Sequence, residues 1–251
     1  MQLSPAETKK TLPQKQKNNM EDYLAFEQKL NLNFKNKDLL QQAFIHRSYI
    51  NEQKGDDLRH NERLEFLGDA VLELVVTDFL FARYPETPEG RLTAYRSSLV
   101  RTESISKAAR DMGMNDLLLL SKGEARDMGK ARDYILANTF ESFTGAVYLD
   151  QGYDAAKQII ADTLFPNIDD IIAEGSWRDA KSFLQEKAQE VHSETPRYEL
   201  VSAEGPDHNK EFVMAVYFGS RKVAEGNGNS KQKAQQDAAG KALVIEGWDE
   251  E

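Results

Sequence analysis

The chain of 251 residues contains no cysteine. That absence excludes disulfide bonds, thiolate metal sites and cysteine nucleophiles, and it fits a reducing compartment such as the cytoplasm. No apolar run is long enough to span a membrane, so no membrane partner is expected. Residues 1–20 are polar and contain lysines but no apolar core, which predicts a disordered tail rather than a signal peptide.

The chain also lacks an excess of positive charge. Lysine and arginine number 32 against 42 aspartate and glutamate residues, which gives a formal net charge of −10. This balance excludes a protein that holds nucleic acid by bulk charge, so any phosphate contact must come from a local basic patch. Hydrophobic residues make up 40% of the chain and charged residues 29%, which is typical of a folded globular protein.

Two patterns follow one another along the chain. Up to about residue 174 the apolar residues repeat with helical spacing, and after a linker at 175–178 strands and helices alternate. Helices are predicted over residues 38–44, 61–84, 92–112, 134–149, 154–173 and 179–191, and from Ser230 onward. Strands are predicted over residues 198–201, 212–218 and 222–224. The predicted fold class is an all-α N-terminal domain over 21–174 and a small α+β domain, α-β-β-β-α in order, over 179–247.

Helix 61–84 carries a row of carboxylates with no lysine or arginine on the same stripe. A helical wheel places these carboxylates on the side opposite an apolar face. The carboxylates are Glu62, Glu65, Asp69 and Glu73, and the apolar residues are Leu64, Leu67, Val71, Leu74 and Val75. The row is either an acidic stripe that faces solvent or a site for a hard cation such as Mg²⁺, which prefers carboxylate oxygens.

Helix 134–149 contains a single charged residue, Glu141, and Asn138 lies one turn before it on the same face. A lone carboxylate in an apolar helix is unfavourable unless it has a partner. That partner is either a buried arginine or a metal ion shared with Glu65 and Asp69. Of these two interpretations, the combined pattern of the two helices favours the metal.

Residues 226–233 read Gly-Asn-Gly-Asn-Ser-Lys-Gln-Lys, a glycine-rich turn that leads into a helix. Ser230 is a suitable N-cap, and a helix N-terminus with Lys231 and Lys233 beside it attracts phosphate. The alternative is an ordinary capped helix with solvated lysines. Small residues on this helix would let it lie close against a sheet: Ala234, Ala238 and Ala242.

The segment Asn61–Leu72, Asn-Glu-Arg-Leu-Glu-Phe-Leu-Gly-Asp-Ala-Val-Leu, resembles the signature of the ribonuclease III family. The resemblance extends to Phe44–Tyr49, to Glu89-Gly90 and to Ile135–Ala137, which leads to Glu141. After the linker the chain resembles a double-stranded RNA-binding domain at residues 180–186, 195–196, 205–208 and 230–231. One nuclease domain followed by one RNA-binding domain is similar to the compact bacterial type, and the resemblance covers about residues 21–247.

The resemblance implies a homodimer of a helical endonuclease domain that cleaves double-stranded RNA without a small-molecule cofactor. The implied metal ion is Mg²⁺, with Mn²⁺ as a substitute, and its ligands would be Glu65, Asp69, Asn138 and Glu141. Two further acidic positions match residues beside the scissile region. The expected catalytic residues are therefore Glu62, Glu65, Asp69, Glu89 and Glu141.

Other matched positions concern the partner subunit and the RNA. Phe66 matches a residue that packs into the partner subunit, and its alternative is an ordinary core aromatic. His46 and Arg47 belong to a family motif and are interpreted as structural. The RNA contacts implied for the second domain lie in the minor groove and on phosphates, and they are assigned to Gln185, Glu186, His208, Ser230, Lys231 and Lys233.

In the implied reaction, a metal-activated water attacks the phosphorus in line with the departing 3′ oxygen. A dimer has one site for each strand, so the products would be 5′-phosphate and 3′-hydroxyl ends with short 3′ overhangs. The second domain would recognise the shape of A-form RNA rather than its sequence. The family suggests ribosomal-precursor and messenger processing as the cellular role.

One residue departs from the family pattern at the site. The family usually has aspartate at position 138, and this chain has Asn138. Asparagine offers a neutral oxygen but no charge, so we expect a lower affinity for the metal. The alternative function is therefore a catalytically weakened protein that binds double-stranded RNA. A weaker alternative is a metal-dependent phosphohydrolase for small substrates, against which the RNA-binding domain argues.

Overall fold

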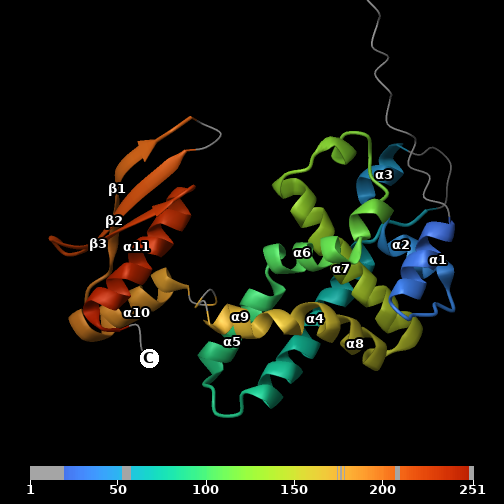
Figure 1. Ribbon diagram of the computed structural model, residues 1–251, viewed down its shortest axis with the longest axis horizontal. Helices are drawn as coiled ribbons and strands as arrows, with labels where there is room; N and C mark the ends of the chain where they lie inside the picture. The colour runs from blue at the N-terminus through green and yellow to red at the C-terminus, as the bar shows by residue number, and fades with distance from the viewer. Residues whose placement is uncertain are drawn as a thin grey trace, which may run out of the picture. The chain divides into compact units, whose positions relative to one another are not determined.

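The computed structural model describes residues 20–52, 58–173, 175, 177, 179–206 and 210–248. The chain divides into two compact units, residues 1–169 and 170–251, one helical and one built on a sheet (Figure 1). Most of the predicted tail and part of the predicted linker lie outside the described residues, and Met20 is the first residue of a helix. The predicted domain limits at 174 and 179 stay a prediction.

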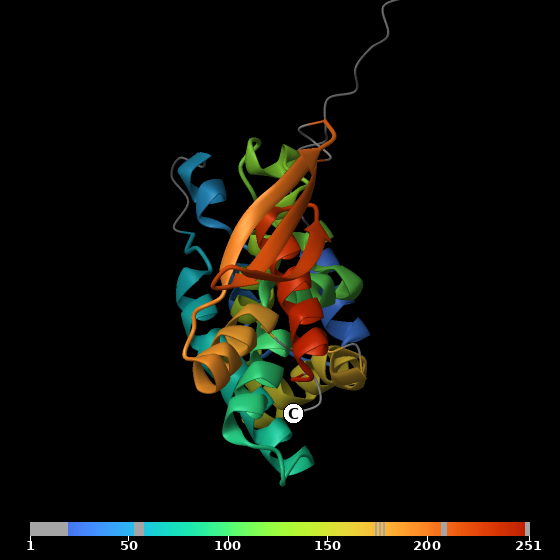
Figure 2. The ribbon, with the colours of Figure 1, turned by 90° about the vertical axis from the view of Figure 1, so that its left-hand side faces the viewer.

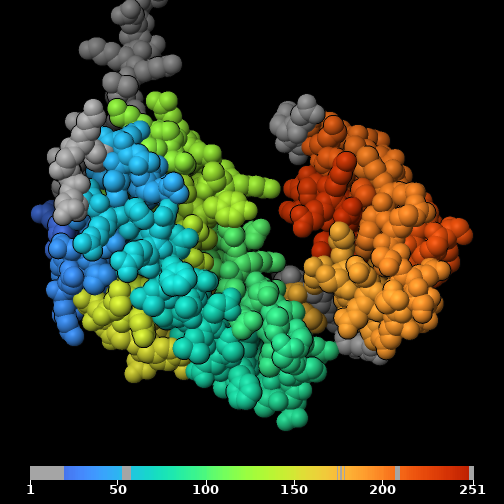
Figure 3. Space-filling model, turned by 180° about the vertical axis from the view of Figure 1, so that it is seen from behind, coloured from blue at the N-terminus to red at the C-terminus, as the bar shows by residue number. Residues whose placement is uncertain are grey.

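The first unit is helical, as the sequence predicts. Its α-helices are α1 (Met20–Lys29), α2 (Lys37–Ala43), α3 (Arg47–Glu52), α4 (Glu62–Arg83), α5 (Glu89–Val100), α6 (Thr102–Met112), α7 (Lys130–Gln151), α8 (Tyr153–Leu164) and α9 (Ile168–Ala173), the last of which continues past the unit boundary. Short 3-10 turns lie at Met114–Leu117, Glu124–Arg126 and Phe165–Asn167. In the space-filling view, side chains close the gaps between these helices (Figure 3).

Two predicted helices of this unit are interrupted. The prediction of one helix over 92–112 is wrong, because Arg101 adopts an extended conformation between α5 and α6, with ψ of 152°. The predicted helix 154–173 is likewise divided by the 3-10 turn that contains Pro166. The predicted helix end at Gly113 is confirmed, since this residue has the left-handed φ of 89° that glycine adopts readily.

Helices α4 and α7 cross at the centre of this unit with their backbones in contact. A Cβ atom added to Gly68 would lie 1.7 Å from the carbonyl oxygen of Glu141, and one added to Gly145 would lie 2.3 Å from the carbonyl oxygen of Leu64. Only glycine permits this approach. The crossing therefore brings the turn of α4 that carries Asp69 against the turn of α7 that carries Glu141.

The buried face of α4 is wider than the sequence predicts. Val76 and Leu80 are buried on the side that the wheel assigned to the carboxylates, whereas Leu74, predicted to be in the core, is 57% exposed. The prediction that the acidic face lies opposite the core is therefore wrong. The acidic residues of α4 lie along the edge of its buried face, since α4 has neighbours on more than one side.

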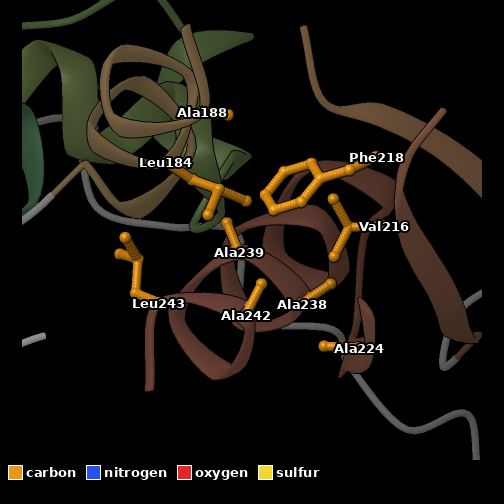
Figure 4. Packing of buried hydrophobic residues seen from close by; sticks show 9 residues of the cluster. All are labelled: Leu184, Ala188, Val216, Phe218, Ala224, Ala238, Ala239, Ala242 and Leu243. Atoms are coloured by element: carbon orange, nitrogen blue, oxygen red, sulfur yellow. The ribbon is translucent and has the colours of Figure 1, made fainter. Parts of the chain in front are cut away.

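The second unit has the predicted order of elements. It consists of α10 (Ala180–His192), β1 (Arg197–Glu204), β2 (Glu211–Phe218), β3 (Arg221–Gly228) and α11 (Lys231–Glu246). The strands form one antiparallel sheet in the order β1-β2-β3, and both helices pack on the same face of it (Figures 1 and 2). Leu184, Val216 and Phe218 meet the alanines of α11 in its core (Figure 4).

The close packing of α11 on the sheet, predicted from its alanines, is confirmed. Ala234, Ala238 and Ala242 are completely buried. A Cβ atom added to Gly226 would lie 2.0 Å from the backbone nitrogen of Ala238. Gly226 and Gly228 belong to β3, so the predicted turn at this place is wrong; here glycine serves the approach of a helix rather than a change of chain direction. Among the described helices, none is both long and apolar enough to cross a bilayer.

Candidate functional site

The structure brings the carboxylates of α4 and α7 together at the helix crossing. Glu141 is half-buried, and its pKa rises to about 8 because of desolvation and, next, the negative charges of Asp69, Glu65 and Glu73. Burial also raises the pKa of Glu65, and the charge of Glu62 raises it further. These shifts show that acidic groups of the two helices lie within electrostatic reach of one another.

Asn138 belongs to the same group. Its side chain hydrogen-bonds to the carboxylate of Glu65 and lowers the pKa of that group, which opposes the effect of burial. Because the acceptor is a carboxylate, the amide nitrogen of Asn138 is the donor. An ionised aspartate at position 138 would have no such donor and would add a negative charge. Asn138 thus favours the ionised form of Glu65.

The central carboxylates have no positively charged partner in the described residues. No lysine, arginine or histidine of the described segments forms an ion pair with Glu65, Asp69 or Glu141. The buried arginine considered as the partner of Glu141 is not found there. Uncompensated carboxylates at a half-buried position are unfavourable for the fold, which is typical of functional sites.

The outer carboxylates of α4 do have partners, contrary to the expectation from the sequence. Arg47 lies 3.3 Å from Glu62, whose other oxygen is 3.6 Å from His60. Arg96 of α5 lies 3.0 Å from Glu73. The wheel missed these pairs because it compares residues of one helix only. Arg47, interpreted from the sequence as structural, therefore pairs with a carboxylate next to the site.

Two other predicted residues lie elsewhere on the unit. Glu89 is exposed at the first residue of α5, where Thr93 donates a hydrogen bond of 3.0 Å to it, and Glu89 is not among the causes of the shifts at Glu65 and Glu141. The structure does not join it to the central group within one chain. Phe66 is 81% exposed, so its interpretation as an ordinary core aromatic is wrong.

The donor chemistry of the central group fits a hard divalent cation. It combines the carboxylates of Glu65, Asp69 and Glu141 with the amide of Asn138, and oxygen donors of this kind suit Mg²⁺. Within the described residues, no group of three or more histidine, cysteine, aspartate or glutamate side chains is arranged so that it could hold a metal ion.

The second unit presents polar and basic groups from two helices. Ser230 caps α11 as predicted, accepting a hydrogen bond of 3.2 Å from the backbone of Lys233. Lys231 and Lys233 are exposed at this helix start, and Gln185 and Glu186 are exposed on α10. A cleft of about 220 Å³ between the two helices is lined by both Gln185 and Gln232. His208 lies outside the described residues.

Comparison with known proteins decides the family. A family model described as ribonuclease-III-like matches residues 36–168, and the double-stranded RNA binding motif matches residues 180–244. The chain belongs to the ribonuclease III family. It is 45% identical to ribonuclease 3 of Enterococcus faecalis over 210 residues, which cover 84% of this chain and 91% of that one. It is 43% identical to ribonuclease 3 of Bacillus velezensis over 225 residues, 90% of each chain.

Solved structures of the ribonuclease III nuclease domain from Campylobacter jejuni resemble the first unit. One is 38% identical, covers 57% of this chain and 92% of that one, and has a TM-score of 0.51. Another, described as showing structural flexibility in a region involved in dimer formation, has a TM-score of 0.50, covers 56% of this chain and 96% of that one, and has the same identity.

These relationships confirm the predicted fold class and enzyme class. The protein is an endoribonuclease of the ribonuclease III family that binds and cleaves double-stranded RNA. Members of this family generally depend on a divalent metal ion. Sequence reasoning missed Arg96 and the paired glycines at the helix crossing, although Gly68 lies inside the recognised signature.

Proposed function

We propose that this endoribonuclease uses Mg²⁺, bound by Glu65, Asp69, Asn138 and Glu141, with Mn²⁺ as a substitute. One observation carries the proposal: Glu141 is half-buried beside Asp69 and Glu65, its pKa is raised to about 8, and no counter-cation faces it in the described residues. A divalent cation is the partner that stabilises such a group. When bound, it would supply a Lewis acid that activates water and stabilises the leaving oxygen.

The chain's own residues prepare the site for this cation. Asn138 donates a hydrogen bond that favours the ionised form of Glu65. Glu141 retains a proton near neutral pH in the absence of a cation, and it must release that proton to act as a ligand. Glu62 and Glu89 are the further acidic residues proposed to line the cleavage site. The products proposed are 5′-phosphate and 3′-hydroxyl ends with short 3′ overhangs.

We also propose that two copies of the chain assemble through the exposed face of α4. Phe66 is 81% exposed there, and Leu74 and Phe81 are 57% and 73% exposed on the same helix. Large apolar side chains concentrated on one exposed helix face are typical of an interaction surface. A homodimer would provide one cleavage site for each strand of the RNA.

The second unit is proposed to hold the duplex by its shape. Gln185 and Glu186, together with His208, would contact minor-groove hydroxyl groups, while Lys231 and Lys233 at the start of α11 would contact phosphates. Ser230 would keep this helix start in place through its cap. Such contacts suit duplex segments of ribosomal precursors and messengers, which we propose as substrates in the cytoplasm.

Glu141→Gln tests the metal site, since it keeps the shape of the side chain and removes its charge. We expect the variant to bind long duplex RNA like the parent chain and to lose nearly all Mg²⁺-dependent cleavage. Cleavage would be followed on gels with Mg²⁺ and with EDTA, and binding by gel shift. Undiminished cleavage by the variant would contradict the assignment of Glu141 as a ligand.

Asn138 supports a second candidate, a weakened enzyme that acts mainly by binding duplex RNA. A neutral ligand contributes less to cation binding than the carboxylate usual in the family. The two candidates differ in the rate of cleavage at saturating Mg²⁺. A low rate that a higher Mg²⁺ concentration does not restore would favour the binding protein.

A further inference from the structure

Arg96 connects α5 to the acidic edge of α4 by two contacts. Its Nε atom lies 3.0 Å from an oxygen of Glu73, and its terminal nitrogen donates a hydrogen bond of 3.0 Å to the hydroxyl of Thr77. The Thr77 hydroxyl in turn donates a 2.6 Å hydrogen bond to the backbone carbonyl of Glu73. The side chains of Arg96 and Glu73 are 35% and 39% exposed. The guanidinium of Arg96 is therefore held by two groups of α4, the carboxylate of Glu73 and the hydroxyl of Thr77.

Glu73 belongs to the same acidic stripe of α4 as the proposed ligands Glu65 and Asp69, but it is not itself a proposed ligand. It lies one helical turn after Asp69 on the same stripe of α4. Its charge also acts on Glu141 across the helix crossing. A free carboxylate at this place would add another negative charge to the cation site and would be able to compete for the ion.

We propose that Arg96 is a positioning residue that holds the Glu73 carboxylate away from the cation site and offsets part of its charge. The proposed ligand set is thereby limited to the central group, and this flank of the site is less negative than it would be with an unpaired Glu73. This inference rests on the metal site proposed above. Because the role proposed for Arg96 is electrostatic, each substitution is expected to change the affinity for the cation in a specific direction.

The test is a titration of the full-length, RNA-free protein with Mn²⁺ at low ionic strength, read from the electron paramagnetic resonance of the free ion. Arg96→Gln leaves Glu73 uncompensated, so we expect Mn²⁺ to bind roughly three- to tenfold more tightly. Glu73→Gln leaves an unpaired guanidinium beside the site, so we expect binding to be weaker by a similar factor. The double variant restores a neutral pair and should lie within about twofold of the parent.

Opposite signs in the two single variants distinguish this role from a structural one. If the pair only stabilised the packing of α5, both single variants would weaken binding together with the melting temperature. Arg96→Lys keeps the charge and should bind Mn²⁺ nearly as the parent does. A matched control is Arg83→Gln, which breaks the exposed pair with Asp169 at the far end of α4 and should leave Mn²⁺ binding unchanged.

Two results would overturn the inference. If Arg96→Gln and Glu73→Gln shift the affinity in the same direction, or not at all, while Glu141→Gln weakens Mn²⁺ binding, the site stands and the role of Arg96 is wrong. If Glu141→Gln leaves Mn²⁺ binding unchanged, the proposed cation site is wrong and the inference is overturned with it.

Discussion

At the scale of single residues, Glu141 is a carboxyl group whose surroundings disfavour its charged form. In water a glutamate ionises near pH 4.5, but here desolvation and three nearby acidic residues raise the pKa to about 8. The fold thus keeps a carboxyl group in a place where its charged form is unfavourable. Such an arrangement persists when a ligand or substrate compensates for it.

The first prediction at this scale concerns stability and pH. Because the folded pKa of Glu141 lies above the unfolded value, its contribution to metal-free stability is complete below about pH 4.5 and is lost as the pH rises to about 8. Allowing for the partial exposure of the group, the loss is roughly 1–3 kcal/mol. Melting temperatures in EDTA between pH 5 and 9 should therefore fall more in the parent than in Glu141→Gln. Parallel curves for the two proteins would contradict this.

The second prediction at this scale concerns Asn138. Asn138→Asp replaces a hydrogen-bond donor by a negative charge next to Glu65. We expect a lower Mg²⁺ concentration at half-maximal cleavage, by about threefold or more, since a fourth carboxylate is added to the proposed ligands. The measurement is a Mg²⁺ titration of the initial rate on a fixed duplex. An unchanged half-maximal concentration would argue that residue 138 is not a ligand.

At the scale of the elements, the crossing of α4 and α7 positions the site. The turns that carry Asp69 and Glu141 lie against each other because the backbones of the two helices touch at Gly68 and Gly145. The distance between the helices is thus determined by two residues without side chains. Any larger residue at either position must push the helices apart.

Gly68→Ala tests this contact. The added methyl group would lie 1.7 Å from the carbonyl oxygen of Glu141, so we expect a loss of about 3 kcal/mol or more in unfolding free energy and a loss of cleavage. Circular dichroism during thermal and urea denaturation measures the first effect. Gly90→Ala is the matched control, because Gly90 lies in the first turn of α5 and nothing lies within 4 Å of the added methyl group. The idea fails if the two variants melt alike.

The sequence predicted the elements better than their surroundings. Helix 61–84 and the α-β-β-β-α order follow from local periodicity, so they agree with α4 and with the second unit. The break at Arg101 was missed because a single extended residue does not alter the apolar pattern. Arg47 and Arg96 were missed as partners because they come from other helices, and no property of α4 alone indicates them.

At the scale of the whole molecule, the two units match two different family models, ribonuclease-III-like and double-stranded RNA binding motif. The chain carries a net charge of −10, yet its second unit presents Lys231 and Lys233 at a helix N-terminus. Its first unit gathers carboxylates that repel RNA until a cation neutralises them. In the function proposed above, recognition of the duplex and cleavage of it depend on separate groups of residues, basic at the start of α11 and acidic on α4 and α7.

Assembly is the prediction that belongs to this scale. Phe66→Glu places a charge on the exposed apolar face of α4, so we expect the dimer to dissociate at micromolar concentration and cleavage to fall at least tenfold. Light scattering coupled to size exclusion gives the mass of each variant. Val244→Glu changes a similarly exposed apolar residue of the second unit and should leave the mass unchanged. A Phe66→Glu variant with the mass of a dimer would locate the interface elsewhere.

The backbone contact between α4 and α7 also bears on which ions the enzyme accepts. Main-chain atoms set the separation of the two helices, so the proposed cation site cannot widen or narrow as a whole when the ionic radius changes. The adjustment must come from side-chain torsions, and Glu65 and Glu141 have one more rotatable bond than Asp69. The short aspartate would act as the fixed reference point, while the two longer acids absorb the difference between one cation and another.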